Sequence, residues 1–338
     1  MRKSYSVVLL ISLLVATLII GVGCGDGSSN AQKDNGEKVT LKISHVFTTD
    51  EPVHKELVKM ADRIMERSNG SIEVQVYPNS ELGGNMDNLE QAAQGANVVC
   101  AVDPAQLATY APDYAVMNGP FLFDTYKDIE NLANSDWHEE MKQEASENGI
   151  KVLSQGWYWG ARHLISDRVV TTPNDLKGVK VRISPVKMWA ETMGAMGAVA
   201  TPLEWSEVYS ALSQGVVEGA EAPLATIYGS KLHETVNQIA LTGHFMGLTG
   251  LSMSQQVFDS MTEEQQKILQ EEVDCVGAII SDICAEEEKV WKKKLEDEGV
   301  IFNEVDKEAF REATKIVYTK FPEWSPGLYE RVTDILNK

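Results

Sequence analysis

The sequence predicts an α/β fold of two units, with one long helix lying across both. Three observations lead to this fold class. Residues 39–102 alternate strand and helix patterns in the order β-α-β-α-β, and residues 151–245 contain a second alternation of this kind. Residues 262–298 contain no proline and a single glycine, Gly277, which is typical of a long helix. The length of 338 residues also suggests two domains.

The first unit begins with alternating apolar residues that predict a strand over residues 39–47. Pro52 opens an amphipathic helix, and Asn69-Gly70 ends it, because glycine accepts the left-handed conformation of a helix stop. The later patterns predict a strand over 72–76, a helix over 85–94, a buried strand over 97–102 and a helical segment over 126–148.

The second unit opens with strands over residues 151–159 and 162–166. Val181 and Ile183 then lie on one face of a further strand, so Arg182 between them points to the opposite face. The unit is completed by helices over 185–194 and 204–214, a short strand over 220–222, a helix that starts at Pro223 and a strand over 239–245.

The long helix begins at Thr262, and Gln265 three residues later completes a helix-start signature. The segment is either one helix of more than thirty residues or two helices with a break near Gly277. Neither half has a strict heptad pattern, which favours a helix across both units over a coiled coil. A strand over 301–305 and two short helices finish the chain.

The N-terminus has the pattern of a secretion signal, which we assign to residues 1–23. Two basic residues precede an almost wholly apolar run over 7–22, which is short for a membrane span. The residues around Cys24 are similar to the lipobox of bacterial lipoproteins, although Gly21 stands where that motif usually has leucine. Cys24 is therefore either lipid-modified or an unmodified residue beside an ordinary cleavage site. The polar residues 24–38 predict a flexible tether.

Net charge limits the classes of partner. The whole chain has a formal net charge of −20, and the part from Cys24 onward has 28 basic and 50 acidic residues over 315 positions, hence −22. An acidic surface of this kind argues against nucleic acid and anionic lipid as partners. It also means that a site for an anion depends on local arginines.

The other three cysteines do not predict a disulfide or a metal site. Cys100 lies in an apolar run and is expected in the core. Cys275 and Cys284 are nine residues apart on the predicted long helix, about 13.5 Å along its axis, so they cannot bond to each other. No metal-ligand spacing is present, and we expect neither a metal nor another cofactor.

Arg162 and Arg182 are the first candidates for a binding site. A guanidinium keeps its charge, and its planar fork matches a carboxylate through two hydrogen bonds. Both arginines lie on predicted strands. Trp205, a little further along the chain, can stack on a ligand or pack beneath a helix start. The pattern predicts a pocket for a small organic anion, and the alternative is that either arginine is solvated or paired with one of the many acids.

Three further residues are candidates for ligand contacts. Glu221 follows Gly219 in a short strand, where its carboxylate can bond a ligand hydroxyl or pair with one of the two arginines. Asp103 follows a buried strand, and it can face the ligand or cap the next helix. His45 ends the first strand and can donate to a ligand or lie exposed.

Catalytic motifs are missing from the sequence. It contains no GxSxG, no Walker-type phosphate loop and no HExxH, and the histidines have no cysteine or carboxylate at metal-ligand spacing. We therefore expect a binding protein rather than an enzyme, and a hydrolase in particular is disfavoured.

Several motifs together resemble one family, the extracytoplasmic solute receptors of tripartite ATP-independent periplasmic (TRAP) transporters, DctP family. They are DLKGVKVR over 175–182, GAVATPL over 197–203, WSEVYSAL over 205–212, GVVEGAE over 215–221 and YPNSELG over 77–83. They occur in one order along nearly the whole chain from Val39, which makes the resemblance specific.

The resemblance implies a two-lobed fold of the periplasmic-binding-protein type II class that closes on its ligand. Lobe I is then residues 39–157 and 248–283, and lobe II is residues 158–247, joined by hinge strands. Residues 284–338 are C-terminal helices that pack across the lobes. It also implies extracytoplasmic location and delivery of the ligand to the membrane permease, which has one small and one large subunit and is driven by an ion gradient, usually of sodium.

The resemblance assigns roles to the candidate residues. Arg182 matches the family arginine that forms a paired salt bridge with the ligand carboxylate, and Arg162 matches a second arginine of many members. Trp205 falls where the family often has an aromatic residue near the ligand. His45 and Asp103 fall in first-lobe loops that commonly face the cleft.

One position departs from the family pattern. Ala222 follows Glu221, where many sialic acid and C4-dicarboxylate receptors of the family have asparagine. This departure argues against those ligands and suggests a more apolar second contact, to which Met188 and Trp189 can add. We therefore expect a receptor for a sugar acid or another monocarboxylate. The alternatives are the binding protein of an ATP-driven importer and a ligand-sensing receptor.

Overall fold

The computed structural model describes residues 37–337. The expected signal peptide, Cys24 and nearly all of the expected tether lie outside the described residues. Among residues 37–337, no helix combines the length and the apolar character that a membrane span requires.

One mixed sheet forms the centre of the fold, with strand order β2-β1-β3-β8-β4-β7-β5-β6 and β9 added beside β8. The parallel pairs β1–β2, β1–β3, β5–β6 and β5–β7 lie toward the two ends of the sheet, the antiparallel pairs β3–β8, β8–β4 and β4–β7 lie in its middle, and β9 pairs parallel with β8. The strands are β1 Val39–Ser44, β2 Ile72–Tyr77, β3 Val98–Ala101, β4 Ile150–Ser166, β5 Lys180–Ile183, β6 Val199–Pro202, β7 Gly219–Pro223, β8 Gln238–Ser254 and β9 Ile301–Asn303.

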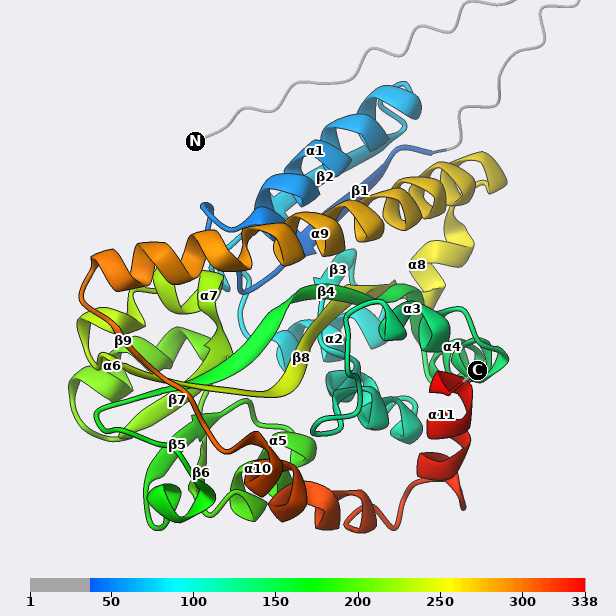
Figure 1. Ribbon diagram of the computed structural model, residues 1–338. Helices are drawn as coiled ribbons and strands as arrows, with labels where there is room; N and C mark the ends of the chain where they lie inside the picture. Colours follow the sequence, from blue (N-terminus) through cyan, green and yellow to red (C-terminus); the bar gives the residue numbers. More distant parts are fainter. Residues whose placement is uncertain (1–36, 338) are drawn as a thin grey trace, which may run out of the picture. The chain divides into compact units, whose positions relative to one another are not determined.

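Helices cover the sheet, as expected for an α/β fold. Figure 1 shows α9 running beside α1 at one end and α7 at the other, with β4 beneath it, and these are the elements it contacts. The helices are α1 Pro52–Arg67, α2 Asn85–Ala93, α3 Asp128–Ala133, α4 Asp136–Glu147, α5 Lys187–Ala195, α6 Val208–Ser213, α7 Leu224–Gly229, α8 Gln255–Ser260, α9 Glu263–Asp297, α10 Lys307–Thr314 and α11 Leu328–Leu336.

The two longest strands, β4 and β8, have 17 residues each and pair antiparallel over their whole length. The sequence predicted two shorter strands, over 151–159 and 162–166, where the structure has β4 alone. It also predicted that the strand from Ile239 ends at Phe245, whereas β8 continues to Ser254. Four register shifts bend the β4–β8 pair without ending it, which is why the alternation of apolar residues is interrupted.

The segment from Thr262 forms a single helix, α9, of 35 residues. The predicted capping box is confirmed, because Gln265 and Thr262 exchange hydrogen bonds of 2.9 and 3.2 Å at its start. The alternative of a break at Gly277 is wrong. Gly277 is present because the helix contacts the Trp157 ring of β4: a Cβ at this position would lie 2.1 Å from Trp157 Nε1.

Two smaller differences have local causes. The predicted helical segment over 126–148 is divided into α3 and α4, because Ser135 caps a new helix by accepting the backbone N–H of His138. The predicted helix over 204–214 begins with a short 3-10 turn, Trp205–Glu207, and continues as α6. The cysteines Cys100 and Cys284 are buried and Cys275 is exposed, all as free thiols.

The buried apolar residues form two clusters. The larger lies around β1, β3, β4 and β8 and contacts α1, α5 and α9, and the smaller lies around β7, α6 and α7 and the end of α9. Because β4 and α9 contribute to both clusters, the two ends of the sheet are joined through shared elements. The expected lobe boundaries stay a prediction, while the two-lobed class itself is taken up below.

Candidate functional site

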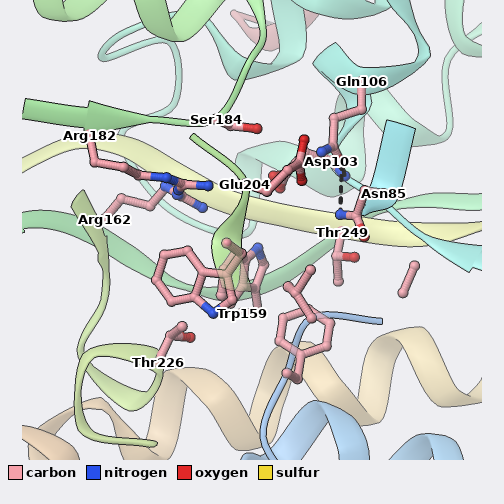
Figure 2. A pocket seen from close by; sticks show the side chains of 14 residues that line it. Asn85, Asp103, Gln106, Trp159, Arg162, Arg182, Ser184, Glu204, Thr226 and Thr249 are labelled. Carbon is pink, nitrogen blue, oxygen red and sulfur yellow. Dashed lines mark hydrogen bonds between the residues drawn. The ribbon is translucent and has the colours of Figure 1, made fainter. Parts of the chain in front are cut away.

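A cavity lies where β5, β4 and the end of β3 come together, with about 540 Å³ of empty space that includes its opening to solvent. Figure 2 shows the arginine side chains entering it from one side and Asp103, Gln106 and Asn85 standing on the other. Its lining residues are Val46, Phe47, Asn85, Ala101, Asp103, Gln106, Trp159, Arg162, Arg182, Ser184, Glu204, Trp205, Thr226 and Thr249.

Arg182 stands on β5, between β6 and β7. Its side chain is only 3% exposed, and its Nε donates to the Leu203 carbonyl at 2.9 Å. The guanidinium carbon lies 5.0 Å from the centre of the Trp205 ring, a cation–π distance. Among the described residues no carboxylate forms an ion pair with Arg182, so its two terminal nitrogens are free for an anion in the cavity.

Burial disfavours the charged form of Arg182, because the guanidinium loses its contact with water. Burial lowers its pKa to about 10, and the neighbouring charge of Arg162 acts in the same direction, while Glu221 opposes the change. Arg182 still carries its charge at neutral pH. A ligand carboxylate would offset this cost, because it would supply the opposite charge that the protein does not place on the fork.

Arg162, on β4, has a complete protein partner. Its Nε and Nη2 donate to the two carboxylate oxygens of Glu221 at 2.5 and 2.7 Å, and the two side chains are 4% and 0% exposed. The structure therefore has the alternative in which Glu221 pairs with an arginine. Arg162 lines the cavity, but its two-point grip is used by Glu221, so it differs from Arg182 in what it can offer to a ligand.

A buried network supports this ion pair from behind. Trp189 Nε1 donates to Glu221 Oε1 at 2.9 Å, and His244 Nε2 lies 3.6 Å from Oε2. Burial alone would raise the pKa of Glu221, but Arg162 lowers it to about 2. Burial also lowers the pKa of His244, which favours the neutral imidazole. Trp189 and Met188 are fully buried and do not line the cavity, contrary to the suggested apolar contact.

Asp103 faces the two arginines across the cavity (Figure 2). Gln106 Oε1 accepts its backbone N–H at 3.0 Å and also the Asn85 side-chain amide at 3.1 Å. The Asp103 Oδ1 atom is buried without a hydrogen-bond partner among the described residues. Burial raises the pKa of Asp103 to about 7, although Arg162 acts to lower it.

Three of the sequence candidates lie outside the cavity lining. His45 is fully buried behind Phe47, with its ring centre 5.5 Å from that of Phe47, and its Nε2 is 3.1 Å from His54 Nδ1. Burial, reinforced by His54, lowers the pKa of His45 to about 3. Glu221 and Ala222 are fully buried in β7. The structure thus brings Arg182, Arg162, Trp205 and Asp103 together at the cavity and places the other three behind its walls.

Sequence reasoning missed several lining residues. Trp159, which was not among the candidate site residues, lines the cavity, and its buried Nε1 has no hydrogen-bond partner among the described residues. Thr249 lies on the part of β8 that the sequence did not predict, and its Oγ1 is likewise buried without a hydrogen-bond partner among the described residues. Glu204 reaches across to α2, where a Cβ at Gly84 would lie 2.7 Å from its Oε2.

The arrangement of charges can bind an anion. Among the described side chains, it does not place a nucleophile and a base together at the cavity. Glu221, His244 and Thr242 lie in a row, with Thr242 Oγ1 2.8 Å from His244 Nδ1, but all three are fully buried and none lines the cavity. Within residues 37–337, His, Cys, Asp and Glu side chains do not gather in a group of three that could hold a metal ion.

Comparison with known proteins agrees with this description. Residues 43–323 match the family Bacterial extracellular solute-binding protein, family 7 (DctP). A "Solute-binding protein" of Chromohalobacter salexigens is 30% identical over 294 residues, which cover 84% of this chain and 85% of that protein.

Two solved structures of TRAP periplasmic solute-binding proteins are similar over almost the whole described fold. One, from Desulfovibrio salexigens in complex with diglycerolphosphate, is 36% identical with a TM-score of 0.85 and covers 89% of this chain and 97% of its own. The other, from Ochrobacterium anthropi with bound L-fuconate, is 34% identical with a TM-score of 0.86 and covers 89% of this chain and 100% of its own. The fold is therefore the two-lobed class predicted, and the chain belongs to the DctP family of bacterial extracellular solute-binding proteins, whose solved relatives serve TRAP transporters.

Proposed function

We propose that this protein is an extracytoplasmic receptor that binds a small organic acid in the cavity at Arg182 and delivers it to a TRAP-type secondary transporter. The ligand is a sugar acid or another monocarboxylate, and the protein itself catalyses no reaction. Family membership supports the receptor role. The observation that carries the ligand class is the free fork of Arg182, since a buried guanidinium without a protein carboxylate is a site prepared for an anion.

The surroundings of Arg182 favour a carboxylate joined to hydroxyl groups. Asp103, Thr249 and Gln106 place oxygen atoms on the cavity wall, and the Trp159 N–H adds a donor. Phe47 and Trp205 provide flat apolar surfaces for the carbon chain. The relative with bound L-fuconate, itself a hydroxylated acid, supports the same class. The relative with diglycerolphosphate makes a phosphate ester the competing chemistry to be tested.

The test is a thermal-shift screen of the purified protein against aldonates, uronates, simple monocarboxylates and sn-glycerol 3-phosphate, followed by calorimetric titration of the strongest binder. A ligand at a hundredfold excess over Kd should stabilise the fold by about 2.7 kcal/mol. Preferential stabilisation by sn-glycerol 3-phosphate over every carboxylate would contradict the proposed ligand class.

Variants of Arg182 separate charge from geometry. Arg182→Met should weaken binding by a factor of about a hundred or more while the unliganded protein stays folded, because a buried ion pair loses one partner. Arg182→Lys should retain part of the affinity, since it keeps the charge and loses the fork. The control is Arg168→Met, which removes a surface arginine that forms ion pairs with Asp167 and Glu218. Undiminished affinity in Arg182→Met would refute the assignment.

Delivery and location follow from the family and carry their own tests. Uptake of the ligand in vesicles that contain the permease should require an ion gradient and no ATP. We also propose that Cys24 anchors the protein to the membrane. Mass spectrometry of the native N-terminus would reveal a lipid on Cys24, and an unmodified N-terminus released from cells would exclude the anchor.

A further inference from the structure

The charged groups around the cavity are unevenly divided. Two arginines face it, but Glu221 neutralises Arg162 through a two-point ion pair. Arg182 is therefore the cation left for a ligand among the described residues that line the cavity. On the same lining, Asp103 and Glu204 add two carboxyl groups. Arg182 matches one carboxylate of the ligand. A second carboxylate would lie near Asp103 or Glu204, with no free cation among the described lining residues to pair with it.

Of these two acids, Asp103 is the one with an oxygen atom that can contact the ligand. Its Oδ1 is buried and has no hydrogen-bond partner among the described residues, so this oxygen is available to a ligand. Glu204 is half-buried, and its carboxylate lies against the backbone of Gly84. Thr249 adds a hydroxyl without a hydrogen-bond partner among the described residues, and the Trp159 N–H, beside Asp103, adds a donor to the cavity wall. These groups suit a ligand hydroxyl, which can donate to a carboxylate oxygen and accept from an N–H.

We propose that Asp103 is a specificity-determining residue, which accepts a hydroxyl group of the ligand and excludes acids that carry a second negative charge. The inference rests on the proposed function, because it assumes that Arg182 holds the ligand carboxylate. It deepens that function by naming the residue that selects, among sugar acids, the aldonates against the aldarates. An aldarate has the same hydroxylated chain with a carboxylate at both ends, so it differs from the aldonate in charge more than in shape.

The matched probes are galactonate and galactarate, and gluconate and glucarate. Each is titrated by calorimetry into the wild-type protein, into Asp103→Asn and into Asp62→Asn. The last variant removes one acid from the exposed face of α1 and changes the net charge equally. We expect the wild type and Asp62→Asn to prefer an aldonate to its aldarate by about thirtyfold or more. We expect Asp103→Asn to lower this preference about tenfold while its aldonate affinity changes by less than about fivefold.

The outcomes are separable. An aldonate that binds no more tightly than its aldarate would overturn this inference and the restriction of the ligand to monocarboxylates, while the receptor role and the carboxylate site at Arg182 would stand. A preference that survives unchanged in Asp103→Asn would refute the role of Asp103. If the wild type binds none of the four probes, the inference falls, while the screen above still judges the proposed function on the other sugar acids and monocarboxylates. If Asp103→Asn does not fold by circular dichroism, Asp103→Ser replaces it.

A second readout needs no variant. Arg162 on β4 and Arg182 on β5 face Asp103 across the cavity, Glu204 lies on the same cavity lining, and Glu221 on β7 acts on Asp103 from behind the wall. Burial raises the pKa of Asp103 to about 7, so the carboxyl group is mostly neutral at pH 5.5 and mostly ionised at pH 8. The wild-type preference for the aldonate should therefore increase about tenfold between these pH values, and in Asp103→Asn it should stay constant. A wild-type preference that does not change with pH would contradict the inference.

Discussion

The ion pair between Arg162 and Glu221 gives the sharpest prediction about stability. Both side chains are almost completely buried, and the carboxylate is bound by two arginine nitrogens and the Trp189 indole. Replacement Glu221→Gln keeps the size of the side chain and an oxygen for one donor. It removes the negative charge, however, and leaves the Arg162 guanidinium buried with an uncompensated charge.

The magnitude follows from two arguments. Breaking a buried ion pair by removing one partner costs about 3 to 5 kcal/mol. The pKa gives an independent figure: it is about 2 against the usual 4.5, despite the opposing effect of burial, which corresponds to about 3 kcal/mol. We therefore expect Glu221→Gln to lower the free energy of unfolding by at least about 3 kcal/mol at pH 7.

The assay is equilibrium unfolding in urea without ligand, with Glu218→Gln as the matched control. Glu218 pairs with Arg168 at the surface, where both side chains are about a third exposed or more, so its replacement should cost less than about 1 kcal/mol. The pKa of Glu221 is depressed, so its contribution is complete above pH 4.5 and lost as the pH falls toward 2. The gap between wild type and Glu221→Gln should shrink over that range. A loss at pH 7 no larger than that of Glu218→Gln would refute the reasoning.

Two further predictions concern other buried contacts. Gly277→Ala should lower the free energy of unfolding in urea by about 1 to 2 kcal/mol, because its Cβ would lie 2.1 Å from the Trp157 ring. The control is Gly194→Ala in α5, whose Cβ would meet nothing within 4 Å and which should raise the stability. Stabilisation by both variants would contradict the prediction, since it would show that α9 can shift away from the ring. Burial raises the pKa of Glu51, whose Oε2 accepts the Thr226 hydroxyl at 2.6 Å, so its ionisation costs stability as the pH rises above 4.5. The stability of Glu51→Gln relative to the wild type should therefore increase between pH 5 and 8, and a constant difference in melting curves would contradict this.

The sequence was sufficient to predict which face of its strand carries the Arg182 side chain, and this face borders the cavity. Its apolar neighbours Val181 and Ile183 made the face of the strand predictable. The sequence suggested Glu221 as a partner of either arginine, but local pattern could not decide between Arg162 and Arg182, because Glu221 lies 59 residues from Arg162 and is brought to it by the pairing of β4 with β7. Strand register thus decides that Arg162 is paired with Glu221 while Arg182 is left without a carboxylate partner among the described residues, and the register cannot be read from a single sequence.

Residues on β8 were missed for a different reason. Thr249 lies between glycines that interrupt any strand pattern, although Gly250 is required where the strand passes close to β4: a Cβ there would lie 2.2 Å from the Ser154 carbonyl oxygen. Gly277 left two alternatives open for a similar reason, because a glycine within a helix pattern can mark a break, whereas in the fold it allows close packing against Trp157. His45 was placed correctly at the end of β1, but whether a side chain there faces the cavity or the core depends on Phe47 beside it.

The continuous pairing of β4 with β8 has a consequence for how the chain can be divided. Each strand starts among the residues of one end of the sheet and finishes among those of the other, so any cut between the halves severs hydrogen bonds inside both strands. Neither half is therefore an independent module that could be transplanted onto a relative to exchange its ligand. Changes of selectivity in this scaffold are best sought in single side chains on the cavity wall, because such substitutions keep the framework whole.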